Sequence, residues 1–191
     1  PFSEPVSEEE EIQRVVPVIQ ALAPKIDVPI SVDTTKARVA RMAVDAGAAI
    51  INDVSALRQD PGLAQVAAEA QVPVILMHML GTPKTMQQSP SYQDLVGEIR
   101  TFLQQAAATA IESGIEPSNI ILDPGIGFGK TFEHNFYLLR HVDKFFDLNH
   151  PILVGSSRKA FIRNKLREIE NKEPQPDSPI VETGTQATVA A

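Results

Sequence analysis

Short apolar runs rich in Val and Ile alternate along this chain with longer stretches in which apolar residues recur every three or four positions. The short runs are typical of strands that are buried on both faces, and the longer stretches are typical of amphipathic helices. The strands are predicted at 28–32, 48–51, 72–77, 120–122 and 152–154, and the helices at 7–23, 35–46, 61–70, 92–113, 132–141 and 158–168. This alternation predicts an α/β fold in which helices cover a parallel sheet.

Two architectures accommodate this pattern, a doubly wound sheet and part of a (β/α)8 barrel. A whole barrel takes about 250 residues, whereas the chain has 191. It begins with Pro1 rather than Met and stops inside a stretch of helical character. We therefore predict one domain over residues 1–191, a partial TIM (β/α)8 barrel of about five parallel strands that lacks the first two strands and the last.

Composition and charge argue against several classes of protein. The 24 Asp and Glu outnumber the 17 Lys and Arg, for a formal net charge of −7, whereas a general nucleic-acid-binding protein needs a basic face. The chain has no Cys, no signal-peptide pattern at its start and no apolar run of about 18 residues. Its four His lack metal-ligand spacing, which argues against a zinc site. We expect a soluble, cytoplasmic protein that binds neither nucleic acid nor a membrane.

Polar residues follow nearly every predicted strand at its carboxyl end. They are Asp33 after the first strand, Asn52 and Asp53 after the second, His78 after the third, Asp123 after the fourth and residues 156–159 after the fifth. In a parallel α/β protein these strand ends share one face, where ligands bind. Polar groups that converge on one rim therefore predict a ligand site there.

Several of these residues also have a structural interpretation. Asp33 is a candidate N-cap for the helix predicted at 35–46, unless a neighbouring Thr caps it and leaves Asp33 for a ligand. One of Asn52 and Asp53 is expected to bond loop backbone, although Asn also offers a donor and an acceptor to a heterocycle. His78 alone is more typical of a hydrogen-bonded structural histidine than of a catalyst.

The stretch 123–130, Asp-Pro-Gly-Ile-Gly-Phe-Gly-Lys, carries three alternating glycines, which allow positive φ and close backbone approach. A tight strand-to-helix turn explains one glycine but not three. The N–H groups of Gly127 and Gly129 are candidates to face an anion or an aromatic ring. The Gly-Lys-Thr at 129–131 matches the end of a phosphate-binding P-loop, but that motif needs Gly where Pro124 stands.

The stretch 155–159, Gly-Ser-Ser-Arg-Lys, is predicted to end the last strand and start a helix. Small residues and free N–H groups at a helix start favour anions, whereas basic side chains are unfavourable there. The presence of Arg158 and Lys159 at this end indicates that at least one is held for a ligand. The alternative is a solvated basic pair, which is common on protein surfaces.

Six motifs together resemble the dihydropteroate synthase family, folate-pathway enzymes with a (β/α)8 barrel. They are Ser-Val-Asp-Thr-Thr-Lys at 31–36, Ile-Ile-Asn-Asp at 50–53, Leu-Met-His-Met at 76–79, Thr-Pro-Lys-Thr-Met-Gln at 82–87, and the stretches 123–130 and 155–159. Their order and spacing also match, over about residues 1–165. The resemblance implies a transferase that condenses 6-hydroxymethyl-7,8-dihydropterin pyrophosphate with p-aminobenzoate to give 7,8-dihydropteroate and pyrophosphate.

The resemblance also implies the roles of individual residues. It implies catalytic roles for Asp33, Asp123 and Lys159. The pterin is expected to contact Asp33, Asn52, Met77, Asp123, Phe128 and Lys159. The p-aminobenzoate is expected near Pro1, Gly127, Lys159 and Ala160. Mg²⁺ is implied as a cofactor whose ligand residue lies outside this chain, and a homodimer is implied for the full-length protein. Because strands are expected to be missing at both ends, the 191-residue chain alone is predicted to be inactive.

Two alternatives stay open: a pterin-binding methyltransferase domain, which has similar Asp and Asn positions, and a non-catalytic pterin-binding module. The motifs at 83–87 and 157–159 favour the synthase. Binding of p-aminobenzoate in the presence of pyrophosphate distinguishes them, since only the synthase needs a pocket for that substrate.

Overall fold

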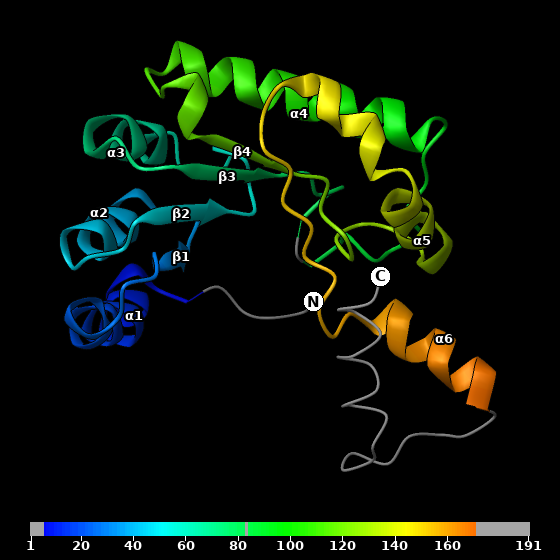
Figure 1. Cartoon of the computed structure of the whole chain (residues 1–191), viewed down its shortest axis with the longest axis horizontal. Helices are drawn as coiled ribbons and strands as arrows, with labels where there is room; N and C mark the ends of the chain where they lie inside the picture. Colours follow the sequence, from blue (N-terminus) through cyan, green and yellow to red (C-terminus); the bar gives the residue numbers. More distant parts are fainter. Residues whose placement is uncertain (1–5, 83, 171–191) are drawn as a thin grey trace.

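The computed structural model of the chain describes residues 6–82 and 84–170 (Figure 1). In chain order the elements are α1 (Glu8–Leu22), η1 (Ala23–Lys25), β1 (Ser31–Asp33), α2 (Ala37–Asp45), β2 (Ile50–Asp53), α3 (Gly62–Ala70), β3 (Val74–Met77), α4 (Leu95–Glu112), η2 (Pro117–Asn119), β4 (Ile120–Asp123), α5 (Phe132–Arg140), η3 (Val142–Leu148) and α6 (Ala160–Glu170). The predicted alternation of strands and helices is confirmed. No helix in the described ranges is both long and apolar enough to cross a membrane.

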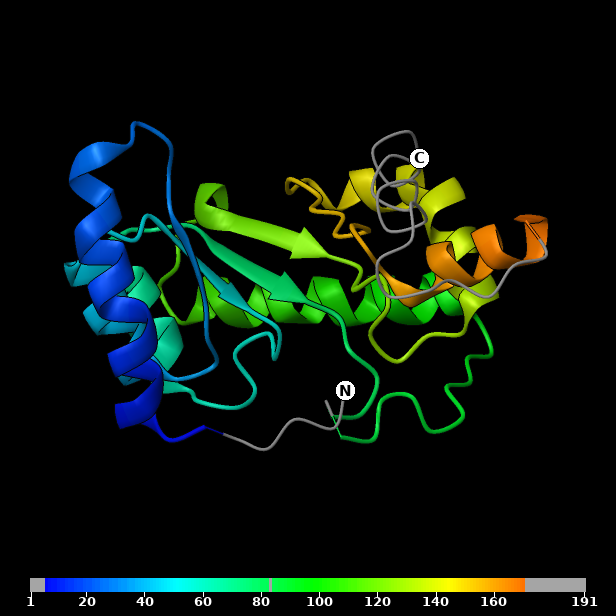
Figure 2. The ribbon, with the colours of Figure 1, turned by 90° about the horizontal axis from the view of Figure 1, so that it is seen from below.

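The described strands form one parallel sheet in the order β1-β2-β3-β4. Each strand lies beside the next strand in the chain, and the order does not reverse. A doubly wound sheet reverses its strand order at a switch point, whereas a (β/α)8 barrel adds strands in chain order. The topology therefore favours a barrel segment. Helices α1, α2 and α3 stack side by side, and α4 packs along β3 and β4 (Figures 1 and 2).

The fifth predicted strand, at 152–154, is reduced to a single bridge between Ile152 and Leu122. Two hydrogen bonds form this bridge, from Leu122 N–H to the Pro151 carbonyl at 2.9 Å and from Leu153 N–H to the Leu122 carbonyl at 2.8 Å. Beyond it, Leu153 and Val154 are each 38% exposed. A strand is stabilised by cross-strand pairing and by packing of its side chains. Leu153 and Val154 are not buried by neighbouring elements, so the pairing does not extend beyond the bridge.

The two faces of the sheet differ in what covers them. Side chains that alternate with the site residues point toward the helices and join the main apolar core, among them Val32, Ile51, Val74, Leu76, Ile120 and Leu122. On the opposite face lie Asp33, Met77 and Asp123, the last residues of β1, β3 and β4, and Asn52, one residue before the end of β2. Polar residues predicted to follow the strands thus lie within the last two residues of β1, β2 and β4. The backbone hydrogen bonds of the sheet therefore fix their positions.

Local contacts set the helix boundaries. Ser7 caps α1, as predicted, by accepting from the Glu10 N–H at 3.2 Å. The helix predicted at 35–46 begins at Ala37, and its first N–H donates to the Asp60 carboxylate at 2.7 Å. The helix predicted from residue 158 begins only at Ala160, because Arg158 has a φ of 56° in the left-handed region. The basic pair therefore precedes the helix and does not lie in its first turn.

Candidate functional site

The residues Asp33, Asn52, Met77 and Asp123 form a row across the carboxyl edge of the sheet, one from each strand. Asp33 pairs with Asn52 across β1 and β2, and Asn52 pairs with Ile75 across β2 and β3. Met77, two residues beyond Ile75, pairs with Asp123 across β3 and β4. Paired residues in parallel strands point to the same face, and so do alternate residues of one strand. The sheet thus places all four predicted residues on one face, with Asp33 and Asp123 at the two ends of the row.

The Asp33 carboxylate is not used as a helix cap. At the start of α2 the Ala37 N–H donates to the Asp60 carboxylate, and the Lys36 N–H donates to Thr34 Oγ1 at 3.2 Å. Asp33 Oδ2 instead accepts from Asn52 Nδ2 at 3.3 Å. Desolvation raises the pKa of Asp33, and the hydrogen bond from Asn52 opposes that shift. Asp33 is therefore held toward its neighbour on β2 and faces the open side of the sheet.

Asp53 is the structural member of the Asn52–Asp53 pair. Its carboxylate accepts from the Ser55 N–H at 2.8 Å and from the Leu57 N–H at 2.6 Å, and the residue is buried. These bonds hold the loop that follows β2, in which Leu57 has a positive φ. The expectation that one of the pair bonds loop backbone is confirmed. Asn52 is left on the face that carries Asp33.

Asp123 is a buried carboxylate, 6% exposed, at the end of β4. Its Oδ1 accepts from the Gly125 N–H at 2.7 Å. Burial raises the pKa of Asp123 to about 6, while the Gly125 hydrogen bond and the charges of Lys130 and Lys159 act to lower it. At neutral pH the group is thus mainly ionised, in a setting where a charge-assisted hydrogen bond to a ligand is strong.

The glycine-rich loop needs its glycines. Gly125, Gly127 and Gly129 have φ values of 72°, 84° and 66°, which L-residues rarely adopt. A Cβ on Gly125 would lie 1.9 Å from the His78 carbonyl oxygen, and one on Gly129 would lie 2.7 Å from Leu80 Cβ. The prediction of positive φ is confirmed at all three positions, and close backbone approach is confirmed at Gly125 and Gly129. The loop therefore packs directly against the segment that follows β3.

The Gly127 N–H does not face an anion, contrary to expectation. It donates to Asn135 Oδ1 on α5 at 2.6 Å, and Asn135 Nδ2 in turn donates to the Thr131 carbonyl at 2.7 Å. The Gly127 carbonyl accepts from Gln87 Nε2 at 2.8 Å. Asn135 is 2% exposed, so its amide would lose buried hydrogen bonds if the loop moved. These contacts hold the rim of the site to α5.

A cavity of about 510 Å³ lies between the glycine-rich loop and the start of α6. Its lining includes the predicted p-aminobenzoate residues Gly127, Lys159 and Ala160, together with Met86, Gln87, Phe128, Lys130, Phe132, Asn135, Arg158 and Phe161. Ligand pockets commonly have volumes of about 300–1,000 Å³, with apolar walls and a few polar groups. Pro1, also predicted for this subsite, lies outside the described residues.

Lys159 and Phe128 connect the cavity to the row of strand-end residues. The Lys159 Nζ lies 4.1 Å from the centre of the Phe128 ring, over its face. Phe128 packs against the small apolar cluster that contains Met77. The charge of Asp123 opposes the lowering of the Lys159 pKa that burial causes. Asp123, Lys159, Phe128 and Met77 thus converge at one end of the row, while Asp33 and Asn52 pair at the other.

The sequence did not predict the buried polar side chains that hold the site residues in place. Lys130, which the P-loop comparison set aside, is 2% exposed and has its Nζ 3.0 Å from both His78 Nδ1 and the Phe128 carbonyl oxygen. His78 is structural, as expected, and is also buried. Asn135, described above, has no clear signal in the sequence, since it follows two other polar residues, Glu133 and His134, at the start of α5.

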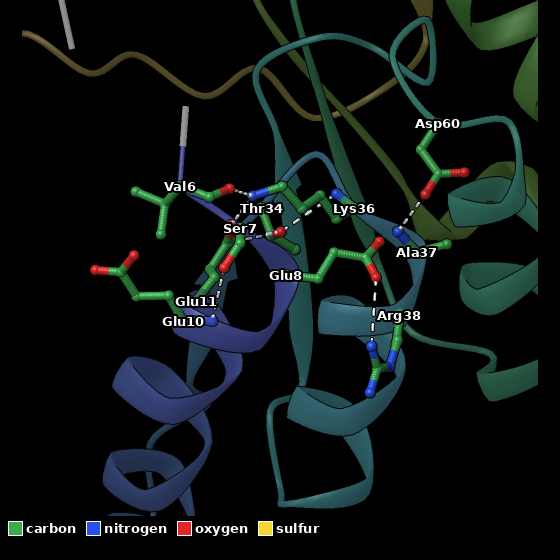
Figure 3. Close-up of polar contacts among 10 residues, drawn as sticks. All are labelled: Val6, Ser7, Glu8, Glu10, Glu11, Thr34, Lys36, Ala37, Arg38 and Asp60. Carbon is green, nitrogen blue, oxygen red and sulfur yellow. Dashed lines mark hydrogen bonds and ion pairs between the residues drawn. The ribbon is translucent and has the colours of Figure 1, made fainter. Parts of the chain in front are cut away.

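A polar cluster behind Asp33 joins α1 to the β1–α2 loop (Figure 3). Glu11 on α1 accepts from Thr34 Oγ1 at 2.5 Å and forms an ion pair with Lys36. The Lys36 Nζ also donates to the Val6 carbonyl at 2.7 Å. Thr34 follows Asp33 directly, and its N–H donates to the Asn52 carbonyl at 3.1 Å. The cluster thus fixes the backbone on which Asp33 lies.

Lys36→Met is expected to lower the free energy of unfolding by about 2 kcal/mol, because it leaves the Glu11 carboxylate partly buried without its cation. The Lys36 and Glu11 side chains are only 20% and 19% exposed. Arg14 forms an ion pair with Glu10 on the surface of α1, at 62% and 51% exposure, so Arg14→Met provides the control, with an expected cost of about 0.5 kcal/mol or less. Urea unfolding of the full-length gene product measures both, and equal costs would contradict the prediction.

The implied Mg²⁺ finds no site in the described ranges. Within residues 6–82 and 84–170, no group of three or more His, Cys, Asp or Glu side chains is arranged to hold a metal ion. The described residues therefore offer no preformed metal site of this kind, and we derive no chemical step through the ion.

Comparison with known proteins agrees with this geometry. A family model described as "Pterin binding enzyme" matches residues 1–190. The chain is 48% identical over 173 residues to a dihydropteroate synthase of Synechocystis, covering 91% of this chain and 60% of the relative. It is 46% identical over 166 residues to the Escherichia coli dihydropteroate synthase, covering 87% of this chain and 58% of the relative. The chain thus spans about 60% of the length of these relatives.

Solved structures give the same result. A structure of the Xanthomonas albilineans dihydropteroate synthase with 4-aminobenzoic acid matches with a TM-score of 0.85 at 41% identity, covering 100% of this chain and 64% of that one. A second structure of that synthase, with 7,8-dihydropteroate, matches with a TM-score of 0.82 at 40% identity, covering 97% and 64%. The resemblance drawn from the six motifs is confirmed, and so is the interpretation of the fold as part of a barrel. The chain belongs to the pterin binding enzyme family and is similar, within it, to the dihydropteroate synthases.

Proposed function

We propose that the full-length gene product is a dihydropteroate synthase. In this reaction the bond between the pterin methylene carbon and the pyrophosphate oxygen breaks, and pyrophosphate leaves with the electron pair. The amine of p-aminobenzoate supplies the electron pair of the new carbon–nitrogen bond and then loses a proton. The products are 7,8-dihydropteroate and pyrophosphate, and the reaction belongs to folate biosynthesis.

The observation that carries this proposal is the adjacency of two different subsites. Met77 pairs with Asp123 at the ends of β3 and β4, and Phe128 packs against the apolar cluster that contains Met77, so this end of the row is the proposed place for a flat heterocycle. The cavity of about 510 Å³, with Gly127 and Ala160 in its wall, lies beside it. Lys159 borders the cavity and is also electrostatically coupled to Asp123. A condensation of two small molecules needs two such subsites in contact, whereas a simple pterin-binding module needs one.

Asp123 is the proposed anchor of the pterin. A pterin edge presents an amino group and a ring N–H as adjacent donors, and one carboxylate accepts from both in charge-assisted hydrogen bonds. Gly125 N–H holds one carboxylate oxygen in place, which orients the group before a ligand arrives. Asn52 offers both an amide donor and an acceptor to the ring nitrogens from the β2 end of the row.

Electrostatic stabilisation is the proposed source of rate acceleration. Departure of pyrophosphate leaves positive charge on the pterin methylene, and fixed carboxylates stabilise that charge more in the transition state than before it. Asp33 and Asp123 lie at the two ends of the row on the same face of the sheet. Lys159 is proposed to donate to the carbonyl oxygen and the ring N5 of the pterin.

The direct test is pyrophosphate release by the full-length gene product. With the pterin pyrophosphate and p-aminobenzoate together, we expect release of pyrophosphate and formation of 7,8-dihydropteroate in equal amounts. Omission of p-aminobenzoate is the control and should abolish release. A protein that binds the pterin but releases no pyrophosphate would be a non-catalytic module, and one that binds no p-aminobenzoate in the presence of pyrophosphate would fit the methyltransferase alternative.

Asp33→Asn is expected to lower turnover about tenfold while changing pterin affinity less than about threefold. A neutral amide keeps the shape and hydrogen-bonding reach of Asp33 but removes the charge that stabilises the transition state. Steady-state kinetics and equilibrium binding of the pterin measure the two quantities. Asp27→Asn, in the exposed loop before β1, makes the same charge change at the other end of the strand and should alter neither. Equal losses of turnover and affinity would refute the electrostatic role.

Three further expectations rest on the same proposal. The 191-residue chain alone should show no turnover, because it spans about 60% of the length of the relatives and supplies only part of a barrel. Mg²⁺ is proposed to act through a ligand residue outside this chain. The full-length gene product is proposed to form a homodimer.

A further inference from the structure

Lys130 is a buried cation whose hydrogen bonds go to neutral groups. It is 2% exposed, and its Nζ lies 3.0 Å from His78 Nδ1 and 3.0 Å from the Phe128 carbonyl oxygen. A Cβ on Gly125 would lie 3.4 Å from this Nζ, so the ammonium lies directly beneath the glycine-rich loop. Lysine is almost never fully buried unless it is paired, because burying an unpaired charge is costly.

His78 contributes no negative charge to this contact. Its Nδ1 accepts from the Lys130 ammonium, which requires the neutral ring. Burial, together with the charges of Lys130 and Arg58, lowers the pKa of His78 to about 3. The ring also packs edge-on against Phe102 on α4, with 4.9 Å between ring centres. His78 is thus a neutral acceptor over the whole physiological range of pH.

Lys130 and Asp123 approach each other at Gly125, whose N–H donates to Asp123 Oδ1 at 2.7 Å and whose added Cβ would lie 3.4 Å from the Lys130 Nζ. Burial lowers the pKa of Lys130 to about 7, and the Asp123 carboxylate opposes this shift. Burial likewise raises the pKa of Asp123, and Lys130 opposes that shift. Among the titratable groups nearby, Lys159 acts on both, lowering the pKa of Lys130 and of Asp123. Each member of the buried pair therefore helps to keep the other charged.

We propose that Lys130 is a positioning residue for the pterin site, which keeps Asp123 ionised and ties the Phe128 backbone to the end of β3. The inference rests on the proposed role of Asp123 in pterin binding. Lys130 lines the cavity wall, but its buried Nζ is directed to His78 and to the Phe128 carbonyl oxygen. Its effect on a ligand passes through Asp123 and Phe128.

The test is the pH dependence of pterin affinity in Lys130→Met, measured by titration calorimetry on the full-length gene product with 6-hydroxymethylpterin as the probe. In the wild type, affinity should fall below about pH 6 as Asp123 takes up a proton. Without the Lys130 charge this fall should begin at a pH about one unit higher, so that affinity is about tenfold weaker than wild type at pH 6.5 and nearly equal at pH 8.5. Lys144→Met, at an exposed lysine on η3, is the matched control and should leave the profile unchanged.

Lys130→Gln is a second variant, which also removes the charge but keeps an N–H donor for His78 and Phe128. It is measured in the same way and replaces Lys130→Met if that variant does not fold. The same shift to higher pH is expected. A loss of affinity that is equal at every pH, or no loss at all, would overturn the proposal, since a purely structural role predicts no shift. A wild-type protein that binds no pterin at any pH would instead refute the proposed function.

Discussion

Asp123→Asn in the full-length gene product is expected to weaken pterin affinity by at least about 100-fold at pH 7.5. The carboxylate of Asp123 accepts two hydrogen bonds from the pterin edge in the proposed complex, whereas an amide presents one oxygen acceptor and turns an N–H₂ group toward a second donor. Hydrogen bonds to a charged group contribute about 1.5–3 kcal/mol each. One of the two is lost and two donors then face each other, so the total cost is about 3 kcal/mol or more.

The same variant has a signature in its pH profile. The pKa of Asp123 is about 6, so wild-type affinity should fall as the pH is lowered through that value, whereas the residual affinity of the Asn variant should stay flat between about pH 5 and 8. Asp143→Asn, at an exposed carboxylate on η3, is the matched control and should keep the wild-type profile. Titration calorimetry measures both curves. A variant that is folded by circular dichroism and retains wild-type affinity would show that Asp123 is not the pterin anchor.

The sequence was sufficient to predict Asp33, Asn52 and Asp123 of the row because each follows a short apolar run, whereas the role of Met77 was predicted only from the family resemblance. Strands that are buried on both faces have few places for a polar side chain, and Asp33, Asn52 and Asp123 occupy the strand ends where a parallel sheet brings them together. The predicted limits of the four strands were off by at most three residues, yet this did not matter, since the register of the sheet fixes the side-chain direction.

Contacts between distant segments could not be predicted in this way. Asp60 caps α2 although it lies 23 residues from Ala37, and no local pattern links the two. Lys130 looks like an exposed lysine in a glycine-rich loop, and only the approach of the loop to the end of β3 buries it. The strand predicted at 152–154 is a bridge because strand formation depends on neighbours that an apolar run cannot specify by itself.

Gly125→Ala is expected to be the most damaging small substitution in the loop, with a loss of about 4 kcal/mol or more in the free energy of unfolding. The added Cβ would lie 1.9 Å from the carbonyl oxygen of His78, which is backbone and cannot rotate away. The φ of 72° adds a left-handed penalty of about 1–2 kcal/mol. A loss of this size approaches the whole stability of a marginal domain, which is about 5–15 kcal/mol.

Two other glycines separate the steric contribution from the conformational one. Gly114 has a φ of 93°, but a Cβ added there would meet its nearest neighbour only at 3.7 Å. Gly114→Ala should therefore cost only the conformational penalty of about 1–2 kcal/mol. An added Cβ at Gly155 meets nothing within 4 Å, so Gly155→Ala should change stability by less than about 1 kcal/mol. Urea unfolding should show the largest loss of unfolding free energy for Gly125→Ala, a much smaller loss for Gly114→Ala and the smallest for Gly155→Ala. If Gly125→Ala cost no more than Gly114→Ala, the loop would not be packed against the His78 carbonyl, and the arrangement that places Lys130 beneath Gly125 would be wrong as well.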